Sequence, residues 1–405
     1  MRHAMRIGRL FGIEILVDSS WILIFVLIAW SLTSLFGMWH PDWQGWTSFL
    51  VALGAAVLFF LSVLAHELAH SLVARAYGLP VRDITLHMFG GVSSIEREPE
   101  RPGAELLIAI VGPITSVVLG IAMIIATAIV TGVAFEQGGE VAEPAQLAVQ
   151  MGPLATLLAW LGPVNVMVGL FNLIPGFPLD GGRILRSILW KATGDVGKAT
   201  RAAAAVGQIV GWAFVALGFS MALGLSLPFF GRGLIGGIWL ALIGLFLRNA
   251  AVQYYAAEDA KELLDGVRVQ ELMRVRGPWV GSDVTLRALV DHWFARSQDE
   301  GFPVFDEGRF VGFVTADDVR AAVRRPDAEE LLVRDVMTDV SKLPVVAPDT
   351  PVFEAMRRFA SSDRRVLPVL VNQTLMGVLD ARDVARYVEL APRGRTAYVR
   401  HPRHA

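Results

Sequence analysis

The 405-residue sequence predicts a polytopic α-helical membrane domain of about six transmembrane helices, with a small membrane-associated β-sheet, followed by a soluble α/β module. Two observations support this division. Long apolar stretches dominate residues 1–250, whereas the rest of the chain has the charged composition of a soluble protein. Within that second part, a pattern of residues occurs twice, over 267–325 and again over 331–390.

Six apolar segments are predicted to cross a bilayer with roughly 30 Å of hydrocarbon, and the first and the last of them are short for that thickness. They are residues 21–36, 49–74, 106–130, 154–173, 203–227 and 234–247. Lys and Arg are frequent at the N-terminus and after the second and fourth segments, whereas the loops 37–48 and 131–153 contain none. Because positively charged loops stay in the cytoplasm, the sequence predicts a multi-pass protein of the cell membrane with a cytoplasmic N-terminus and a cytoplasmic C-terminal module.

Short stretches of alternating hydrophobicity predict the small sheet. Residues 84–88 follow the second apolar segment and alternate between apolar and polar side chains, and residues 12–17 near the N-terminus have a similar character. An alternation with a period of two is typical of a β-strand. We therefore expect both stretches to be strands of one sheet.

The second apolar segment contains His66, Glu67 and His70. Histidines four residues apart lie on the same face of a helix, and with the adjacent glutamate they have the spacing of a zinc metalloprotease. Ionisable side chains within a spanning helix each cost roughly 2.5–3.5 kcal/mol on insertion scales, so they usually mark a functional site. The alternative interpretation is a buried, hydrogen-bonded cluster without a metal. At a rise of about 1.5 Å per residue, His66 lies roughly 13 Å below the cytoplasmic boundary of the membrane near Arg75.

A third metal ligand is expected at the end of the fourth apolar segment. Pro175 and Pro178 interrupt regular helix there, and Asp180 precedes two glycines. Interrupted backbone at membrane depth is tolerated where it is buried in protein or lines a water-filled cavity. Since the chain has no cysteine, a zinc site must be built from histidine and carboxylate.

These motifs together resemble the site-2 proteases, a family of intramembrane zinc metalloproteases that pair an HExxH helix with a later segment like residues 172–181. The resemblance implies one Zn²⁺ per chain, a catalytic carboxylate and an asparagine that positions or polarises the scissile carbonyl. The residues concerned are the zinc ligands His66, His70 and Asp180, and the catalytic Glu67 and Asn172. Two further stretches, 89–91 and 112–113, match other features of the family. In that family a sheet near this position receives the substrate as an added strand.

For other polar residues near these motifs the simpler interpretation is preferred. Asn165 is expected to form a helix–helix hydrogen bond, and His87 to be an ordinary strand histidine. Positive charge in a cytoplasmic loop accounts for Arg186, and Glu105 is read as an interfacial residue.

The C-terminal repeats resemble a tandem pair of cystathionine-β-synthase (CBS) domains, each with the order helix, strand, helix, strand, strand, helix. Such pairs often bind adenine nucleotides and often associate as homodimers. The first copy has the Thr315 and Asp318 that the family uses to contact ribose, whereas the second has Asp380 in place of the hydroxyl residue, and Asp383. A purely structural module is the alternative. Residues 251–266 are expected to form a helical linker, and residues 391–405 a disordered basic tail.

The sequence therefore predicts an intramembrane zinc endopeptidase that cleaves a peptide bond within a transmembrane segment of another protein. By resemblance, that substrate is a membrane-bound transcriptional regulator or an anti-sigma factor. The main alternative is a CBS-gated divalent-metal transporter or channel, and a further one is an inactive scaffold. The sequence has no basic stripe interleaved with aromatic residues, so it predicts no nucleic-acid partner; the net charge of −2 says nothing on this point.

Overall fold

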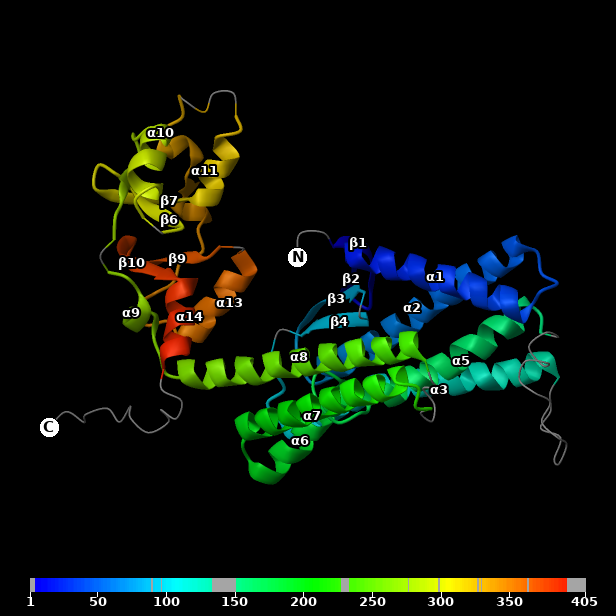
Figure 1. The fold of residues 1–405 in the computed structure, drawn as a ribbon. Coiled ribbons are helices and arrows are strands. Elements are labelled where there is room, and N and C mark those ends of the chain that lie inside the picture. The colour runs from blue at the N-terminus through cyan, green and yellow to red at the C-terminus, as the bar shows by residue number, and fades with distance from the viewer. Residues whose placement is uncertain are drawn as a thin grey trace. The chain divides into compact units, whose positions relative to one another are not determined.

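The computed structural model describes residues 4–391 except 89, 96, 133–150, 227–232, 276, 298, 326, 327, 329 and 363. The tail predicted over 391–405 lies outside the described residues except for its first position. The chain divides into two compact units, Met1–Ala256 and Ala257–Ala405. Figure 1 shows the elements of both units along the chain.

Long helices form most of the first unit. They are α1 (Ser19–Trp39), α2 (Gly45–Ala76), α3 (Pro102–Thr131), α5 (Pro153–Asn172), α6 (Asp180–Thr193), α7 (Val196–Ala222) and α8 (Leu234–Leu264). All of these except α6 are long and apolar enough to cross a membrane, which confirms the six predicted spans. Helix α8 runs on through most of the predicted linker and ends before Gly266, whose φ of +77° favours glycine.

Buried polar contacts also hold the first unit together. At the end of α1, Nε2 of His40 lies 2.7 Å from Oγ1 of Thr156 in α5, and both side chains are buried. Buried polar groups of this kind need a partner because the surrounding apolar side chains offer none.

A four-stranded sheet packs beside α2. Its strands are β1 (Met5–Leu10), β2 (Ile13–Val17), β3 (Val81–His87) and β4 (Gly90–Ile95), in the spatial order β1-β2-β3-β4. Strands β2 and β3 are parallel, and the outer pairs are antiparallel. Ile13 and Ile84 on the sheet form a buried cluster with Leu64 of α2. The two predicted strands are confirmed, whereas the sequence did not predict β4, which contains few apolar residues.

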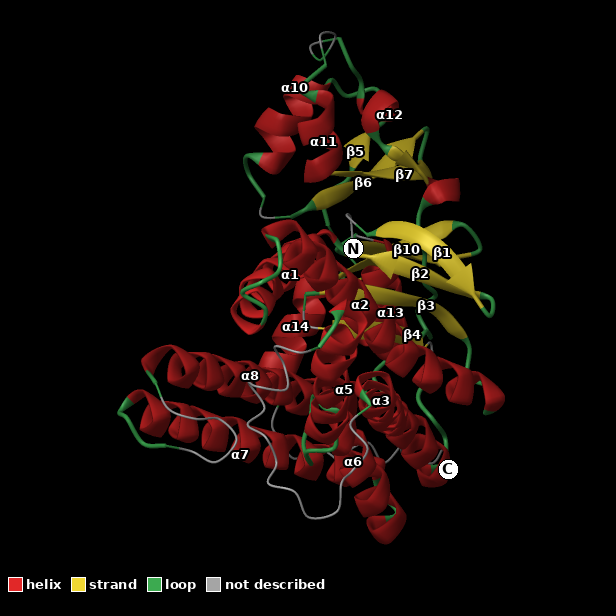
Figure 2. Ribbon diagram, turned by 90° about the vertical axis from the view of Figure 1, so that its right-hand side faces the viewer, coloured by secondary structure: helices red, strands yellow, loops and turns green. Residues whose placement is uncertain are grey.

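The second unit contains the two repeats. The first comprises α9 (Val269–Leu272), β5 (Val280–Gly281), α10 (Leu286–Leu289), a π-helical turn (Val290–Phe294), β6 (Gly301–Asp306), β7 (Arg309–Thr315) and α11 (Ala316–Ala322). The second comprises α12 (Val333–Val336), β8 (Thr338–Asp339), a 3₁₀ turn (Val340–Lys342), α13 (Val352–Ser362), β9 (Val366–Val371), β10 (Thr374–Asp380) and α14 (Ala381–Leu390). The strands form one sheet of β5-β6-β7-β8 and one of β10-β9, drawn in yellow in Figure 2.

The two repeats exchange their first helices. Val269, at the start of the first repeat, is buried in a cluster with Leu367 and Val369 of the second. Conversely, Val333 of the second repeat is buried with Phe302 and Val304 of the first. Each hydrophobic core therefore needs residues from both copies.

Candidate metal centre

Three predicted ligands meet in the first unit. His66 and His70 lie one helical turn apart on α2, and their Nε2 atoms are 3.1 Å from each other. Asp180, the first residue of α6, places its Oδ2 atom 3.1 Å from Nε2 of His66 and 3.2 Å from Nε2 of His70. Both histidines are buried, with 5% and 4% of their surface exposed. The structure thus brings together residues that are 110 or more positions apart in the chain.

The opposite ring nitrogens are held by α3. Nδ1 of His70 lies 2.5 Å from the carbonyl oxygen of Ile108, and Nδ1 of His66 lies 2.9 Å from Oγ of Ser116. Because a carbonyl oxygen can only accept, Nδ1 of His70 donates, which leaves Nε2, on the side of Asp180, as the ring nitrogen that can bind a metal. Such contacts orient the histidine rings of metal sites and are usual in their outer shell.

The arrangement fits a zinc ion. One proton can bridge only one pair among these three mutually contacting atoms, whereas a single cation would satisfy them all. Two ligands about 2.0–2.1 Å from a tetrahedral zinc ion lie about 3.3–3.4 Å from each other, close to the separations in this site. Two histidines and one carboxylate are also a ligand set of catalytic zinc, which keeps a fourth position open. Among the described residues, this is the single cluster of three or more histidines and carboxylates with such geometry.

Two glycines leave space for the side chains of His66, Glu67 and His70. A Cβ atom on Gly112 of α3 would lie 2.2 Å from Nε2 of His70 and 2.7 Å from Nε2 of His66. A Cβ atom on Gly91 of β4 would lie 2.4 Å from Cγ of Glu67. All three distances are far below van der Waals contact. Any larger residue at either position would displace a side chain of the site.

Glu67 lies beside the three predicted ligands and is bonded to a residue of β4. Oγ of Ser93 donates to Oε2 of Glu67 over 2.7 Å, and Oγ of Ser71, one turn along α2, donates to Oγ of Ser93 over 3.1 Å. Sequence reasoning missed Ser93 and Ser116 because neither belongs to a recognised motif. The sequence offered only an indirect signal for them. Ser93 lies two residues after Gly91 and Ser116 lies four residues after Gly112, and both glycines belong to stretches that match features of the family.

The segment between α5 and Asp180 is tightly turned. Asn172 is the last residue of α5 and is half-buried. Its catalytic role stays a prediction. The peptide bond between Phe177 and Pro178 is cis. Asn165, also on α5, is buried, and its amide donates to the carbonyl oxygen of Leu161 within the same helix. Its contact with another helix is the 4.0 Å approach of Nδ2 to Sδ of Met123 in α3, in place of the helix–helix hydrogen bond to an oxygen or nitrogen.

The interpretation of Arg186 as a positive charge of a cytoplasmic loop and of Glu105 as an interfacial residue was wrong, because the two side chains are buried together. Nε of Arg186 in α6 donates to Oε1 of Glu105 in α3 over 2.6 Å, and a second guanidinium nitrogen contacts the same oxygen. Glu105 is fully buried and Arg186 is 8% exposed. Counting loop charges treats each one as solvated, and therefore misses a pair that two helices bury together.

Strand β3 carries a further buried carboxylate and the predicted strand histidine. Asp83 accepts hydrogen bonds from Nε of Arg82 and from Oγ of Ser94 in β4, over 2.7 and 2.8 Å. Although burial opposes the effect, these bonds lower the pKa of Asp83. His87 lies in β3 opposite Gly90, and burial lowers the pKa of its imidazole. Asp83 therefore links β3 to the strand that holds Glu67.

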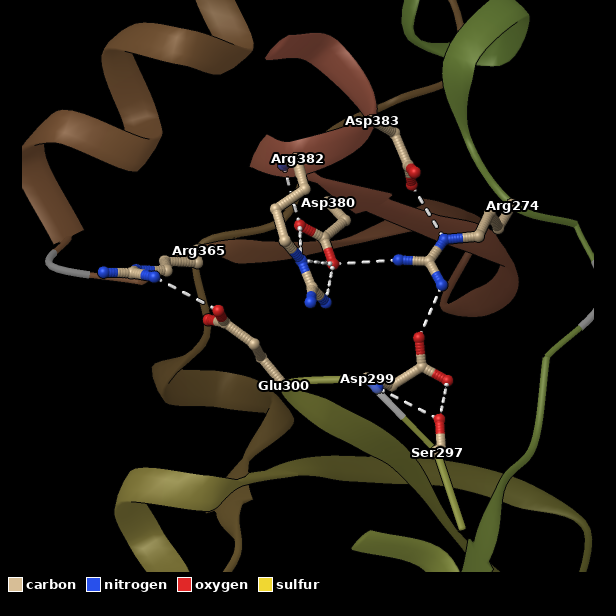
Figure 3. Close-up of polar contacts among 8 residues, drawn as sticks. All are labelled: Arg274, Ser297, Asp299, Glu300, Arg365, Asp380, Arg382 and Asp383. Atoms are coloured by element: carbon tan, nitrogen blue, oxygen red, sulfur yellow. Dashed lines mark hydrogen bonds and ion pairs between the residues drawn. The ribbon is translucent and has the colours of Figure 1, made fainter. Parts of the chain in front are cut away.

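In the second unit, a charge cluster joins the two repeats (Figure 3). Arg274 contacts Asp299 of the first repeat at 2.5 Å, and Asp380 and Asp383 of the second at 2.8 and 2.7 Å. Arg382 also contacts Asp380, at 2.7 Å. Although partial burial opposes the effect, Asp299 and Asp383 raise the pKa of Arg274. The cluster borders a cavity of about 320 Å³. Among its lining residues are Arg274, Trp279, Asp299, Met376 and Asp380.

The predicted nucleotide-binding residues of the first repeat contact each other. Oγ1 of Thr315 donates to Oδ2 of Asp318 over 2.7 Å, and the backbone N–H of each residue donates to the side chain of the other. This reciprocal arrangement caps the N-terminus of α11. The pair therefore has a structural role in the helix, whether or not it also binds a ligand.

Comparison with known proteins gives consistent results for both units. Residues 54–218 match the sequence pattern of Peptidase family M50, and residues 269–325 and 333–390 each match that of the CBS domain. Rip3 of Mycobacterium tuberculosis, named as a zinc metalloprotease, is 32% identical over 96% of this chain and 94% of its own length. A protein of Synechocystis with a similar name, sll0528, is 30% identical over 96% of both chains. The solved site-2 protease of Methanocaldococcus jannaschii aligns with 62% of this chain and 95% of its own, at 30% identity and a TM-score of 0.39.

Proposed function

Since this chain belongs to Peptidase family M50, the site-2 proteases, and is thus a zinc metalloprotease with two CBS domains, we propose that it cleaves a transmembrane segment of another protein. The observation that carries this proposal is the meeting of His66, His70 and Asp180 beside Glu67, on a helix that is apolar and long enough to span the bilayer. The transporter interpretation gains no support from relatives that are named zinc metalloproteases.

The proposed mechanism assigns each side chain one task. His66, His70 and Asp180 would hold one Zn²⁺, which lowers the pKa of a water molecule and polarises the peptide carbonyl. Glu67 accepts the proton of the attacking water and passes it to the leaving amine. Ser93 keeps the Glu67 carboxylate turned toward the reacting atoms through its 2.7 Å hydrogen bond. The amide of Asn172 donates to the oxyanion that develops on the substrate.

Strand β4 is the proposed docking edge for the substrate. It lies at one edge of the sheet, with β3 on its inner side, and it carries both Gly91 and Ser93 next to Glu67. An unpaired strand edge offers backbone donors and acceptors to an extended peptide. A transmembrane helix must unwind locally before it can pair in this way, because its backbone groups are otherwise bonded within the helix. We therefore expect substrates with helix-breaking residues near the cleaved bond.

The direction of product release follows from the loop charges. Lys and Arg are concentrated in the loops that adjoin the site and are absent from loops 37–48 and 131–153. The site would then face the cytoplasm, together with the N-terminus and the CBS domains. The expected product is a cytoplasmic fragment, such as a transcriptional regulator or a factor controlled by a cleaved anti-sigma factor.

Reconstituted proteolysis with the Glu67→Gln variant tests the proposal. Purified protein in liposomes is incubated with a panel of single-span substrates, and its zinc content is measured in parallel. We expect wild type to hold one zinc and cleave within a span, and Glu67→Gln to hold zinc with activity reduced about 1,000-fold or more, as general-base loss can produce. Glu14→Gln, on strand β2, serves as the matched control and should cleave normally. Cleavage by Glu67→Gln at the wild-type rate would refute the assignment.

For the CBS domains we propose an adenine nucleotide site at Thr315 and Asp318 in the first repeat only. In the second repeat both corresponding carboxylates, Asp380 and Asp383, are already bonded to Arg274. Titration calorimetry of the whole protein with ATP and with AMP tests this: one site per chain, lost in Asp318→Asn, is expected. Absence of heat with either nucleotide would leave the module a structural one.

A further inference from the structure

A buried ion pair connects α6, the helix that begins with Asp180, to α3, the helix whose Ile108 and Ser116 contact the two histidine rings. Arg186 of α6 donates through Nε to Oε1 of Glu105 in α3 over 2.6 Å. Glu105 has no exposed surface, and Arg186 is 8% exposed. Because charges buried this deeply are destabilising unless they are paired, the two helices are constrained to keep this contact.

Glu105 lies on the same face of α3 as the groups that orient the histidines. Ile108, Gly112 and Ser116 follow it at intervals of three and four residues, which places all four side by side along the helix. Ile108 accepts from His70, Ser116 contacts His66, and Gly112 makes room for both rings. One face of α3 therefore bonds both histidines at one end and Arg186 at the other.

Arg186 also contacts the segment on the other side of Asp180. Its guanidinium carbon lies 5.6 Å from the centre of the Phe177 ring, a cation–π distance, and Phe177 is only 2% exposed. Arg186 follows Asp180 by six residues, about 9 Å along the helix axis. Arg186, in the helix that follows Asp180, thus contacts both α3 and a residue that precedes Asp180.

We propose that Arg186 and Glu105 are positioning residues that fix the rotation and depth of α6, and so set the Asp180 carboxylate against the two histidines. This inference rests on the proposed role of Asp180 as a zinc ligand. Neither residue touches the three ligand atoms; both act through the backbone of α6. Ligand geometry must be held to about 0.5 Å for full affinity and activity, and a buried, two-point contact on α6 supplies that constraint.

The test separates positioning from folding by removing the charges singly and together. Glu105→Gln and Arg186→Met each leave a buried charge or polar group without its partner, so both stability and zinc affinity should fall. The double variant Glu105→Leu/Arg186→Met leaves no unpaired charge, so its thermal unfolding temperature should return close to the wild-type value. Its zinc affinity should nevertheless stay about 10–100-fold below wild type, because the directional contact is still missing.

Three measurements on the full-length protein in detergent give the outcome. Zinc dissociation constants are measured by competition with a chromophoric chelator, the visible absorption spectrum is recorded with Co²⁺ in place of zinc, and kcat and KM are determined separately. We expect the double variant to show weakened zinc binding, an altered Co²⁺ spectrum, and a loss mainly in kcat. Thr156→Val, which removes the buried contact to His40, is the control: it should lower stability and change neither metal readout.

The outcomes distinguish this inference from the function on which it rests. If wild type binds no zinc, the proposed metal site fails, and the inference fails with it. If wild type binds zinc but the double variant has the same zinc affinity and Co²⁺ spectrum, the ion pair only anchors the fold and the inference is overturned. Weak zinc binding in a double variant of restored stability supports it.

Discussion

At the scale of single residues, the site depends on groups that touch the motif residues rather than on the motif alone. His66, Glu67 and His70 could be predicted from spacing and residue type, since helical periodicity brings them together on one side of a helix. Asp180 was predicted from the interrupted backbone around it and from the resemblance to a known family. The sequence could not predict the roles of Ser93, Ser116 and the carbonyl group of Ile108. Their roles arise from how α3 and β4 pack on α2, and a backbone carbonyl carries no signature in the sequence.

The first prediction concerns Gly112. A methyl group there would overlap Nε2 of His70, so Gly112→Ala must push both imidazoles away from Asp180. We expect zinc binding to weaken by at least about 100-fold, the upper range for disturbed ligand shells. The zinc content that remains after dialysis, measured by metal analysis, tests this expectation. Gly103→Ala, on the first turn of the same helix with open space around it, is the control. Zinc content equal to wild type in Gly112→Ala would contradict the geometry.

The second prediction concerns Ser93, which bonds Glu67 but none of the three ligands. A hydrogen bond to a charged group contributes about 1.5–3 kcal/mol, so Ser93→Ala should reduce kcat by roughly tenfold or more. The zinc content should stay at the wild-type value. Ser94→Ala is the matched control, because Ser94 bonds Asp83 rather than Glu67. A fall in zinc content, or an unchanged kcat, would show that Ser93 does not act through Glu67.

At the scale of elements, the spans and the order of secondary structure in the repeats could be predicted, but their partners could not. Long apolar segments identify helices by composition alone. Strand β4 was missed because Gly-Gly-Val-Ser-Ser-Ile lacks the alternation of a half-buried strand. The exchange of α9 and α12 between repeats was missed for a different reason: both copies carry the same apolar pattern, so either core fits the pattern equally well.

The exchange gives the third prediction. Val333 belongs to the second repeat by sequence but is fully buried in the core of the first. Val333→Ala should destabilise that core by roughly 2 kcal/mol through lost apolar contact and a cavity. Hydrogen exchange should therefore increase in β6 and β7, with β9 and β10 less affected. Val269→Ala should give the opposite pattern, and it serves as the reciprocal control. Faster exchange confined to the mutated repeat would contradict the exchange of helices.

At the scale of the whole molecule, the division into a membrane unit and a CBS unit could be read from composition, because apolar and charged residues segregate along the chain. The sequence could not show that α2, α3 and α6 converge on one site. Sequence spacing fixes neighbours within a helix, whereas contacts between helices depend on which side chains interlock. Glu105 and Arg186 illustrate the difference, since 81 positions separate two residues that bond each other.

The last prediction follows from the convergence of ligands from two helices. Because His66 and His70 lie on α2 and Asp180 on α6, the complete site exists only when the first unit is folded. A ligand that binds only the folded state stabilises it by about 4.1 kcal/mol at 1,000 times its dissociation constant. Removing zinc with a chelator should therefore lower the unfolding temperature of the membrane unit and leave that of the CBS unit unchanged. Scanning calorimetry with and without added zinc measures both. Asp180→Asn should unfold at the metal-free temperature under either condition; a zinc-dependent rise of the wild-type size in this variant would mean that the ion binds elsewhere.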